Sequence, residues 1–383
     1  MTKNMVRVWG GEGSRGGIST HGDALISRTA DGTDLNEIWA EIQEAMAVYN
    51  EQRRNIADLL SFRTTKVNDV VPQSFTTEQF EEASEFGLPR AIRPPADYLK
   101  LGYNFKDYDL GSRFTWKFLR AASDEQIQDY VARVVEADNA LRTNSIMNRV
   151  FSPQTRTNDW GNTVYGQWNA DMTPPPYMGK TFPGSHTHYL ATASATLDSN
   201  HIEQLLVHVQ EHGYGINTGT TMVILLNPTD FETSRISAWR AGEEYRTGGP
   251  LPKWDFIPSA LMPAWISPDT IHGPVPNSDF NGLQVWGSYG KALVIKSEFT
   301  PTNYVAVFAT GGPNSSLNAV GFREHKDPEW QGLRHLPGPG PYPIVGSTYM
   351  RSFGTGVRHR SAAVVAQITA GSTYTAPTFA LPA

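Results

Sequence analysis

The residues with the clearest chemical potential are histidines near the middle of the chain. His208–Val209–Gln210–Glu211–His212 matches H-x-x-E-H, the pattern of one class of zinc metallopeptidase. In that class, two histidines one helical turn apart hold zinc and the glutamate acts as a base. A zinc site also needs a third ligand, which the sequence does not identify. The pattern therefore gives a zinc hydrolase as one hypothesis.

The position of these histidines on the expected helix favours another interpretation. At helical spacing, His201, His208 and His212 share one flank, and Glu211 lies roughly opposite the apolar face. That face consists of Ile202, Leu205, Leu206 and Val209. A histidine stripe beside a buried face is typical of a solvated flank or a subunit boundary, so we expect no metal ligands here.

Three shorter motifs are weaker. Gly11–Gly16 reads G-x-G-x-x-G, but no amphipathic helix opens on its last glycine, so it is not expected to bind a dinucleotide. Ser185–His186–Thr187–His188 offers metal ligands, and Arg358–His359–Arg360 offers a phosphate site. Both are short enough to occur by chance, and turn or strand-edge roles are favoured. We expect no catalytic, cofactor-binding or metal-binding residue, and no cofactor.

Composition narrows the function classes. The chain has 383 residues, beyond the size at which one hydrophobic core usually stops growing, so two packed regions are expected. Its 32 Lys and Arg against 38 Asp and Glu argue against a dedicated nucleic-acid binder. The absence of cysteine excludes disulfides and thiolate sites. The N-terminus lacks an apolar run that could serve as a signal peptide or membrane span. We therefore expect a soluble protein made inside a cell.

The elements that position these motifs begin with an arm and two helices. Residues 1–33 are rich in Gly, Ser and Thr and are expected to form an arm. A capping pattern at Asp34 and apolar residues at helical spacing predict a helix within residues 34–60. Residues 61–122 alternate extended pieces with breakers, which predicts a projecting β-hairpin-like loop. A second capping box at Ser123 and an apolar stripe predict an unusually long helix over 123–151.

The second half is expected to form an α/β lobe. A helix from Leu197 ends at Gly213–Gly215, and a buried strand follows at Met222–Leu226. Further strands are predicted by apolar runs at residues 293–295, 304–308 and 361–368. The tail after Thr369 is polar, and we expect it to be mobile.

Four stretches carry a resemblance to a known family. They are the acidic helix Asp34–Trp39, the run Val134–Leu141 in the long helix, Val320–His325, and Phe353–Val365. With the order of elements, they resemble the major capsid proteins of tailed bacteriophages, and the last stretch looks like the closing strand in phages of actinobacteria. The resemblance implies an α+β, HK97-like capsid fold with an N-terminal arm, an extended β-hairpin loop, a long spine helix, and peripheral and axial domains.

The resemblance also implies a division of the chain. In it, the arm covers 1–33, the N-arm helix 34–60, the extended loop 61–122, the peripheral domain 123–189 with its spine helix 123–151, the axial domain 190–340, and the return to the peripheral domain with the C-terminal tail 341–383. Some relatives cross-link a loop lysine to a neighbouring subunit. Lys66, Lys100 and Lys106 are available here, and nothing in the sequence selects one.

The function that the resemblance implies is a structural one. The chain would self-assemble into pentamers and hexamers of an icosahedral shell around packaged double-stranded DNA, which it contacts non-specifically. A separate scaffolding protein, a portal and a decoration protein are the partners implied, with assembly in the host cytoplasm, a final place in the virion and no membrane. The alternatives are an encapsulin-like compartment with the same core and the zinc hydrolase that His208, Glu211 and His212 suggest.

Overall fold

The fold is described from a computed structural model, which covers residues 26–51, 55–73, 82, 87, 97–215, 219–259, 278–339 and 342–382. The chain divides into two compact units. Unit 1 comprises Met1–Gln52, Lys106–Arg142 and Glu324–Phe353, and unit 2 comprises Arg53–Phe105, Thr143–Arg323 and Gly354–Ala383. The expected extended loop thus contributes residues 61–105 to unit 2 and residues 106–122 to unit 1. The Gly11–Gly16 motif lies outside the described residues.

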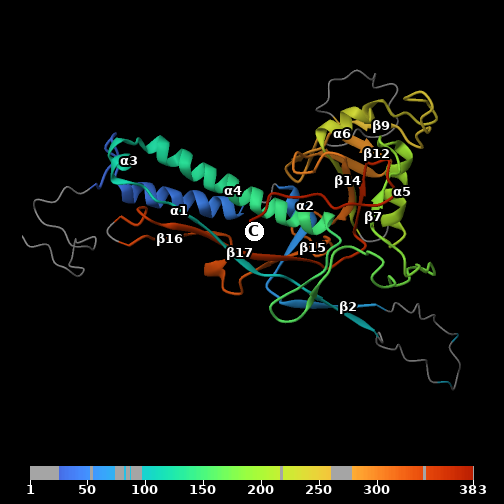
Figure 1. The fold of residues 1–383 in the computed structure, drawn as a ribbon, viewed down its shortest axis with the longest axis horizontal. Coiled ribbons are helices and arrows are strands. Elements are labelled where there is room, and N and C mark those ends of the chain that lie inside the picture. Colours follow the sequence, from blue (N-terminus) through green and yellow to red (C-terminus); the bar gives the residue numbers. More distant parts are fainter. Residues whose placement is uncertain are drawn as a thin grey trace, which may run out of the picture. The chain divides into compact units, whose positions relative to one another are not determined.

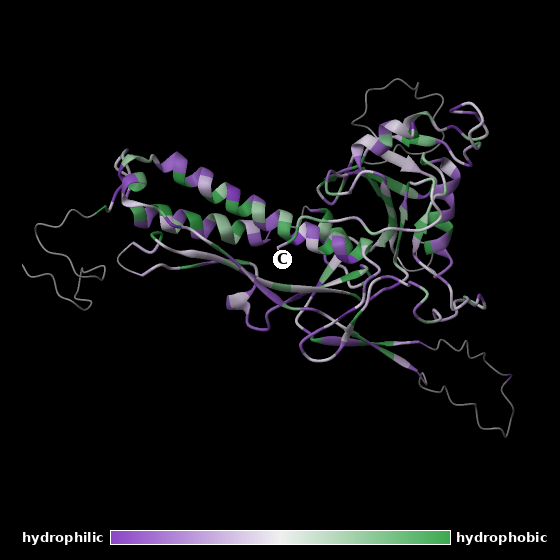
Figure 2. Ribbon diagram, in the orientation of Figure 1, coloured by the Kyte–Doolittle hydropathy of each residue, from purple (hydrophilic) through white to green (hydrophobic). Residues whose placement is uncertain are grey.

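Unit 1 is built on helices α1 (Leu35–Glu51), α3 (Trp116–Ala121) and the first part of α4 (Asp124–Phe151). The expected long helix is confirmed, and so is its capping box. The Ser123 amide donates to Gln126 Oε1 at 3.2 Å, and the Gln126 amide lies 3.4 Å from Ser123 Oγ. Helices α1 and α4 each carry hydrophobic and hydrophilic residues along their length (Figure 2).

The helix expected within residues 34–60 is two helices. After α1, a short helix α2 covers Ile56–Leu60. Asn55 has an extended backbone with φ −117° and ψ 153°, and its side chain accepts a hydrogen bond from the Ala57 amide. A residue with these dihedral angles cannot belong to a continuous helix, and its short polar side chain is suited to begin one instead. Residues 50–55 are all polar, and the helical spacing of the apolar residues before them did not reveal where a second helix starts.

The strands of unit 1 pair with β17 (Thr348–Val357), which continues into unit 2. On one side β16 (Leu333–Leu336) pairs antiparallel with residues 348–351, and on the other β4 (Lys106–Gly111) pairs antiparallel with residues 348–353. A short 3₁₀ helix, η3 (Pro328–Trp330), precedes β16. Hydrophobic residues of the helices and strands form one core: Leu35, Ile38, Ile42, Met46, Leu119, Ile127, Val131, Val134, Leu333, Ile344 and Tyr349.

Unit 2 contains a mixed seven-stranded sheet (Figure 1). Its order is β7 (Tyr189–Ala191), β18 (Ala363–Gln367), β14 (Tyr304–Thr310), β8 (Thr221–Leu226), β13 (Ala292–Lys296), β12 (Gly287–Tyr289) and β9 (Phe256–Pro258). Strand β8 is parallel to β13 and antiparallel to β14. All residues of β14 are buried, which explains why this strand reads as a continuous apolar run.

Helices and small hairpins complete unit 2. Helix α5 (Ser199–Gln210) packs its buried residues into the sheet's core, and α6 (Pro228–Thr233) and η1 (Ile236–Ala238) follow β8. The remaining strands are β1 (Ser61–Thr64), parallel to β15 (Val320–Glu324), and the hairpins β2 (Asn68–Pro72) with β3 (Tyr98–Gly102), β5 (Arg156–Thr157) with β6 (Thr163–Val164), and β10 (Asp279–Phe280) with β11 (Leu283–Gln284). Among the described helices, none combines the length and the hydropathy needed to cross a membrane.

The C-terminal tail differs from the expectation. The Tyr374 hydroxyl donates to the Phe151 carbonyl at 2.7 Å, and the Tyr304 hydroxyl donates to the Thr375 carbonyl, also at 2.7 Å. The ring of Phe379 lies 5.9 Å from that of Phe151. The prediction of a mobile tail was therefore wrong, because polar composition does not reveal hydrogen bonds to distant residues.

Close backbone approach explains one glycine of the Phe353–Val365 stretch. A Cβ atom added at Gly354 would lie 1.6 Å from the carbonyl oxygen of Asn104. No Cβ atom fits that close to a carbonyl oxygen, so the close approach of this strand to Asn104 requires glycine at position 354.

Candidate assembly surfaces and a histidine cluster

The first candidate surface is the hairpin of β2 and β3. Asn68 pairs with Gly102 and Pro72 with Tyr98, and the hairpin forms a two-stranded sheet of its own. Two-stranded ribbons are marginally stable in water without further packing. The paired strands cover a shorter part of the chain than the loop expected over 61–122. Strand β1 before them pairs with β15, and strand β4 after them pairs with β17.

Buried polar contacts hold the base of this hairpin. The Tyr103 hydroxyl donates to Asp69 Oδ2 at 2.8 Å, and Lys66 Nζ donates to Asp69 Oδ1 at 2.9 Å. Asn158 Nδ2 donates to the carbonyls of Tyr103 at 3.1 Å and Val67 at 3.3 Å. Burial raises the pKa of Asp69, but the hydrogen bonds from Lys66 and Tyr103 outweigh it and leave the pKa below its usual value. The carboxylate is thus kept charged at the hairpin's root.

Beyond this base, the hairpin exposes apolar side chains. Val70 is 55% exposed and Tyr98 is 54% exposed. Large apolar groups exposed on a narrow ribbon are unfavourable in water and are typical of surfaces that another protein covers.

The second candidate surface is a groove of about 750 Å³ between α1 and α4 in unit 1. Its lining is apolar along the middle, with Val48 54% exposed, and carries carboxylates at its edges. The residues that line it are Ile38, Glu41, Ile42, Glu44, Ala45, Val48, Tyr49, Gln128, Val131, Ala132, Val135 and Glu136.

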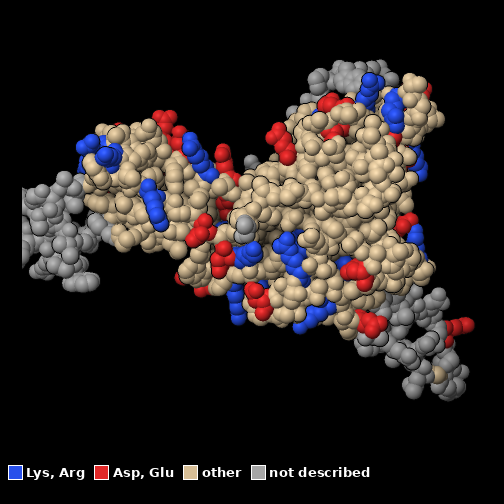
Figure 3. Space-filling model, in the orientation of Figure 1, with Lys and Arg blue, Asp and Glu red and all other residues tan. Residues whose placement is uncertain are grey.

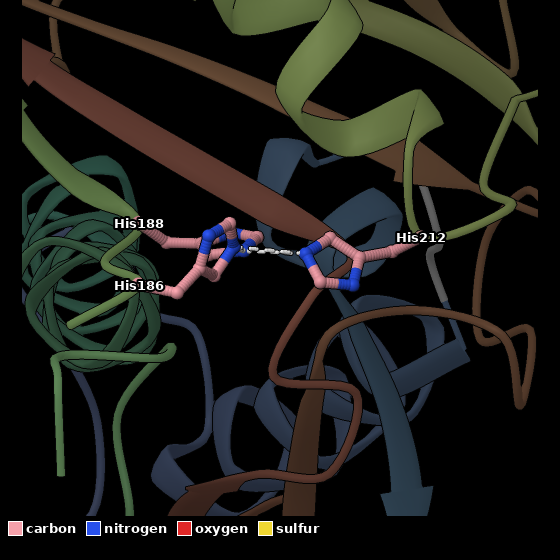
Figure 4. Close-up of side chains that lie close together, drawn as sticks. All are labelled: His186, His188 and His212. Carbon is pink, nitrogen blue, oxygen red and sulfur yellow. Dashed lines mark hydrogen bonds between the residues drawn. The ribbon is translucent and has the colours of Figure 1, made fainter. Parts of the chain in front are cut away.

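Three histidines meet in unit 2. His186 and His188 lie in the segment that leads into β7, and His212 lies in the turn after α5 (Figure 4). Their Nε2 atoms are 3.1 Å apart for His186 and His188, 2.9 Å for His186 and His212, and 3.3 Å for His188 and His212. His188 is fully buried, and His212 is 8% exposed.

The surroundings of the cluster fix its rings and their charge. The Nδ1 atom of His188 lies 2.7 Å from the Ala363 carbonyl, and the ring of His212 stacks on Phe182 with centroids 4.0 Å apart. Burial lowers the pKa of His186 to about 4 and that of His212 to about 3, and it also lowers the pKa of His188. All three imidazoles are therefore neutral at pH 7.

The H-x-x-E-H motif does not form the site that its pattern suggested. His208 Nε2 lies 2.9 Å from the Thr187 carbonyl, and its ring stacks on His186. Helix α5 ends at Gln210, and Glu211 forms an ion pair with Lys180. His201 accepts a hydrogen bond from the Asp198 amide within a capping box. Only His212 of the motif joins the cluster, and its partners come from the separate Ser185–His188 motif.

No protein-family model and no curated protein matches the chain. Among solved structures, it is similar to a chain titled Mycobacterium phage Patience, with 34% sequence identity over 92% of this chain and 93% of that chain, and a TM-score of 0.70. The chain belongs to the major capsid proteins of tailed bacteriophages. It has the HK97-like fold, forms part of an icosahedral shell, and is a virion component.

Matches with lower TM-scores include two other particles. The capsid of an empty GTA particle aligns with 14% identity over 82% of this chain and 91% of that chain, at a TM-score of 0.44. The mature capsid of bacteriophage PhiM1 aligns with 10% identity over 82% of this chain and 87% of that chain, at 0.46.

The remaining charged motifs of the capsid protein serve internal contacts. Arg360 donates to the Gly166 and Gln167 carbonyls and pairs with Asp171, and its guanidinium lies 4.0 Å from the Trp168 ring centroid. Arg360 is one arginine of the Arg358–Arg360 motif that the sequence offered for phosphate, and the other, Arg358, lies 3.4 Å from Asp69 Oδ2. Lys66, Lys100 and Lys106 are all exposed. On the face drawn in Figure 3, basic residues are interspersed with acidic ones.

A buried histidine in unit 1 predicts pH-dependent stability. His335 stacks between Trp39 and Tyr349, with 4.1 Å to each ring centroid, and burial lowers its pKa to about 4. The unfolded chain takes up a proton near pH 6.5, and the folded chain does so only near pH 4. The stability contributed by neutral His335 is thus complete above pH 6.5 and lost as pH falls toward 4, by at most about 3 kcal/mol.

Urea unfolding of the unassembled subunit at pH 7 and pH 4.5 checks this. We expect His335→Gln to show a smaller loss of unfolding free energy between the two pH values than the wild type. Other buried histidines contribute equally to both proteins and cancel in the comparison. Parallel pH dependences would contradict the assignment.

Proposed function

We propose that this capsid protein assembles into pentamers and hexamers, and that the paired strands β2 and β3 and the groove between α1 and α4 bind neighbouring copies. The observation that carries the proposal is the exposure of Val70 and Tyr98 on a ribbon that, among the described residues, forms a two-stranded sheet of its own. In a shell, each subunit is covered on several sides by identical subunits, which removes such apolar surface from water. The division of the chain belongs to the same proposal: an N-terminal arm at 1–33, an N-arm helix at 34–60, an extended loop at 61–122, a peripheral domain at 123–189, an axial domain at 190–340, and the return to the peripheral domain with the tail at 341–383.

The proposal includes partners that a subunit of this kind needs. The net charge of −6 gives the chain no overall attraction to DNA, and the contact with packaged double-stranded DNA in this proposal is non-specific and weak. A separate scaffolding protein guides assembly in the host cytoplasm, a portal occupies one vertex, and a decoration protein binds the finished shell. The role is structural and requires no catalytic residue.

Charge placed on the hairpin tests the proposal. Val70→Asp combined with Tyr98→Asp puts two carboxylates where a neighbour would bury apolar groups, at a cost of several kcal/mol per interface. We expect the variant to stay as free subunits or capsomers in sedimentation and negative-stain microscopy when it is produced with its scaffold. The matched control, Val70→Thr, keeps the β-branched shape and should form shells.

The unfolding free energy of both proteins in urea separates failed assembly from failed folding. Both side chains are exposed, so the substitutions should change subunit stability by only about 0.5 kcal/mol. Normal shells from the doubly charged variant would show that the hairpin does not bind neighbours. Shells that contain a cargo enzyme and no DNA would instead support the encapsulin-like alternative.

A further inference from the structure

The histidine cluster combines residues from motifs that are distant in the sequence. His186 and His188 precede β7, and His212 follows α5, so the cluster joins two elements of unit 2. In Figure 4, the rings of His186 and His188 point toward the ring of His212. Nothing in the assembly function explains why three ring nitrogens should converge at one point inside a subunit.

Hydrogen bonding alone cannot satisfy this arrangement. A hydrogen bond between two ring nitrogens requires that one carries a hydrogen and the other a lone pair. Each nitrogen either carries a hydrogen or has a lone pair, so at least two of three nitrogens in mutual contact are of the same kind. At least one of the three contacts, at 2.9, 3.1 and 3.3 Å, therefore opposes two lone pairs or two N–H groups. A cation that accepts all three lone pairs removes this conflict.

The distances fit a metal of zinc's size. In a tetrahedral zinc site with Zn–N bonds of about 2.0–2.1 Å, the nitrogens lie about 3.3 Å apart. In the plane of the three Nε2 atoms, the point equidistant from them is about 1.8 Å from each. Because zinc–nitrogen bonds are longer than this, the ion would lie about 1 Å out of that plane. Only small adjustments of the rings are needed to complete the coordination.

The contacts behind the rings also suit metal ligands. Because a carbonyl oxygen only accepts, His188 Nδ1 must donate to Ala363, which leaves the Nε2 lone pair facing the cluster. Metal-bound histidines almost always donate their other ring N–H to such an acceptor, which fixes the ring and its tautomer. Phe182 stacks on His212, and His208 stacks on His186 with ring centroids 4.5 Å apart, so two further rings are held in place.

We propose that His186, His188 and His212 bind one zinc ion through their Nε2 atoms, and that this ion ties the segment before β7 to the turn after α5. Nitrogen ligands select zinc and related transition metals over magnesium or calcium, which prefer oxygen. The three histidines leave a fourth position, which water fills. The ion would stabilise unit 2 within each subunit, independently of contacts between subunits.

Metal analysis of protein made without a histidine tag tests the proposal. After incubation with zinc and gel filtration, the wild type should retain one zinc per chain by mass spectrometry of the metal. Zinc in excess should raise its thermal midpoint by roughly 5 °C, and magnesium should not. His212→Phe, which keeps the stacking on Phe182 but removes the nitrogen, should lose both effects.

Two controls make the result specific. His201→Gln and His359→Gln should retain the zinc, because neither residue contacts the three histidines of the cluster. If His212→Phe does not fold, His186→Gln and titration of the wild type with Co²⁺ decide, since tetrahedral cobalt has a characteristic visible absorption. A wild type that retains no zinc and shows no cobalt spectrum would overturn the proposal. Loss of zinc in His359→Gln with retention in His212→Phe would do the same.

Discussion

Replacing Asp138 with alanine is expected to lower the unfolding free energy of the subunit by about 3–5 kcal/mol. Asp138 Oδ2 accepts hydrogen bonds from Arg351 at 2.9 Å and from the Tyr49 hydroxyl at 2.8 Å. The side chains of Arg351 and Asp138 are only 4% and 3% exposed. Removing the carboxylate takes one charged partner away from a buried guanidinium, which costs far more than the pair itself contributes.

This contact joins three elements of unit 1, namely α1, α4 and β17. Burial, with the adjacent carboxylate, raises the pKa of Tyr49, so its hydroxyl stays protonated and keeps donating. Urea unfolding of the unassembled subunit measures the effect. Asp129→Ala, at an exposed position on the same helix, is the matched control and should change stability by about 0.5 kcal/mol at most.

A double variant distinguishes the loss of this ion pair from a general packing defect. Asp138→Ala combined with Arg351→Met removes both charges and should recover much of the stability lost in the single variant. A double variant that is less stable than Asp138→Ala would show that the charges do not act as a pair. Shell yield should follow the unfolding free energy across this series, because assembly needs a folded unit 1.

Replacing Trp239 with alanine is expected to destabilise unit 2 by about 3–5 kcal/mol. The side chain is fully buried, and its ring meets Tyr289 and Tyr245 with centroids 5.0 and 5.6 Å apart. Its indole N–H donates to the Ser234 carbonyl at 3.2 Å. Alanine therefore leaves a large cavity and a buried carbonyl without its donor, and the core around η1 cannot close over that volume.

Comparison with two further variants checks the cause. Trp239→Phe retains most of the ring and should cost less than half as much as alanine, because the cavity is smaller. Leu251→Ala, at a side chain that is 59% exposed, should change stability little. Equal losses for alanine and phenylalanine at position 239 would show that the hydrogen bond to Ser234, rather than packing, holds this core together.

The sequence alone predicted the features that neighbouring residues encode. Apolar spacing and the capping box at Ser123 placed α4, and uninterrupted apolar runs placed β8, β13 and β14. These patterns arise because helix and strand periodicity are local, so each element carries its own pattern within about ten to thirty residues. The order of such elements, with stretches such as Phe353–Val365, was enough to indicate a capsid protein.

Tertiary structure decided every contact between residues far apart in the chain. Asp138 and Arg351, Asp69 and Tyr103, and the tail residue Tyr374 with Phe151 are joined only by folding. The histidine cluster is the clearest case, because the sequence showed two motifs and gave no reason to combine them. Local spacing cannot encode such contacts, since they depend on how β7 joins the sheet and how α5 packs against it.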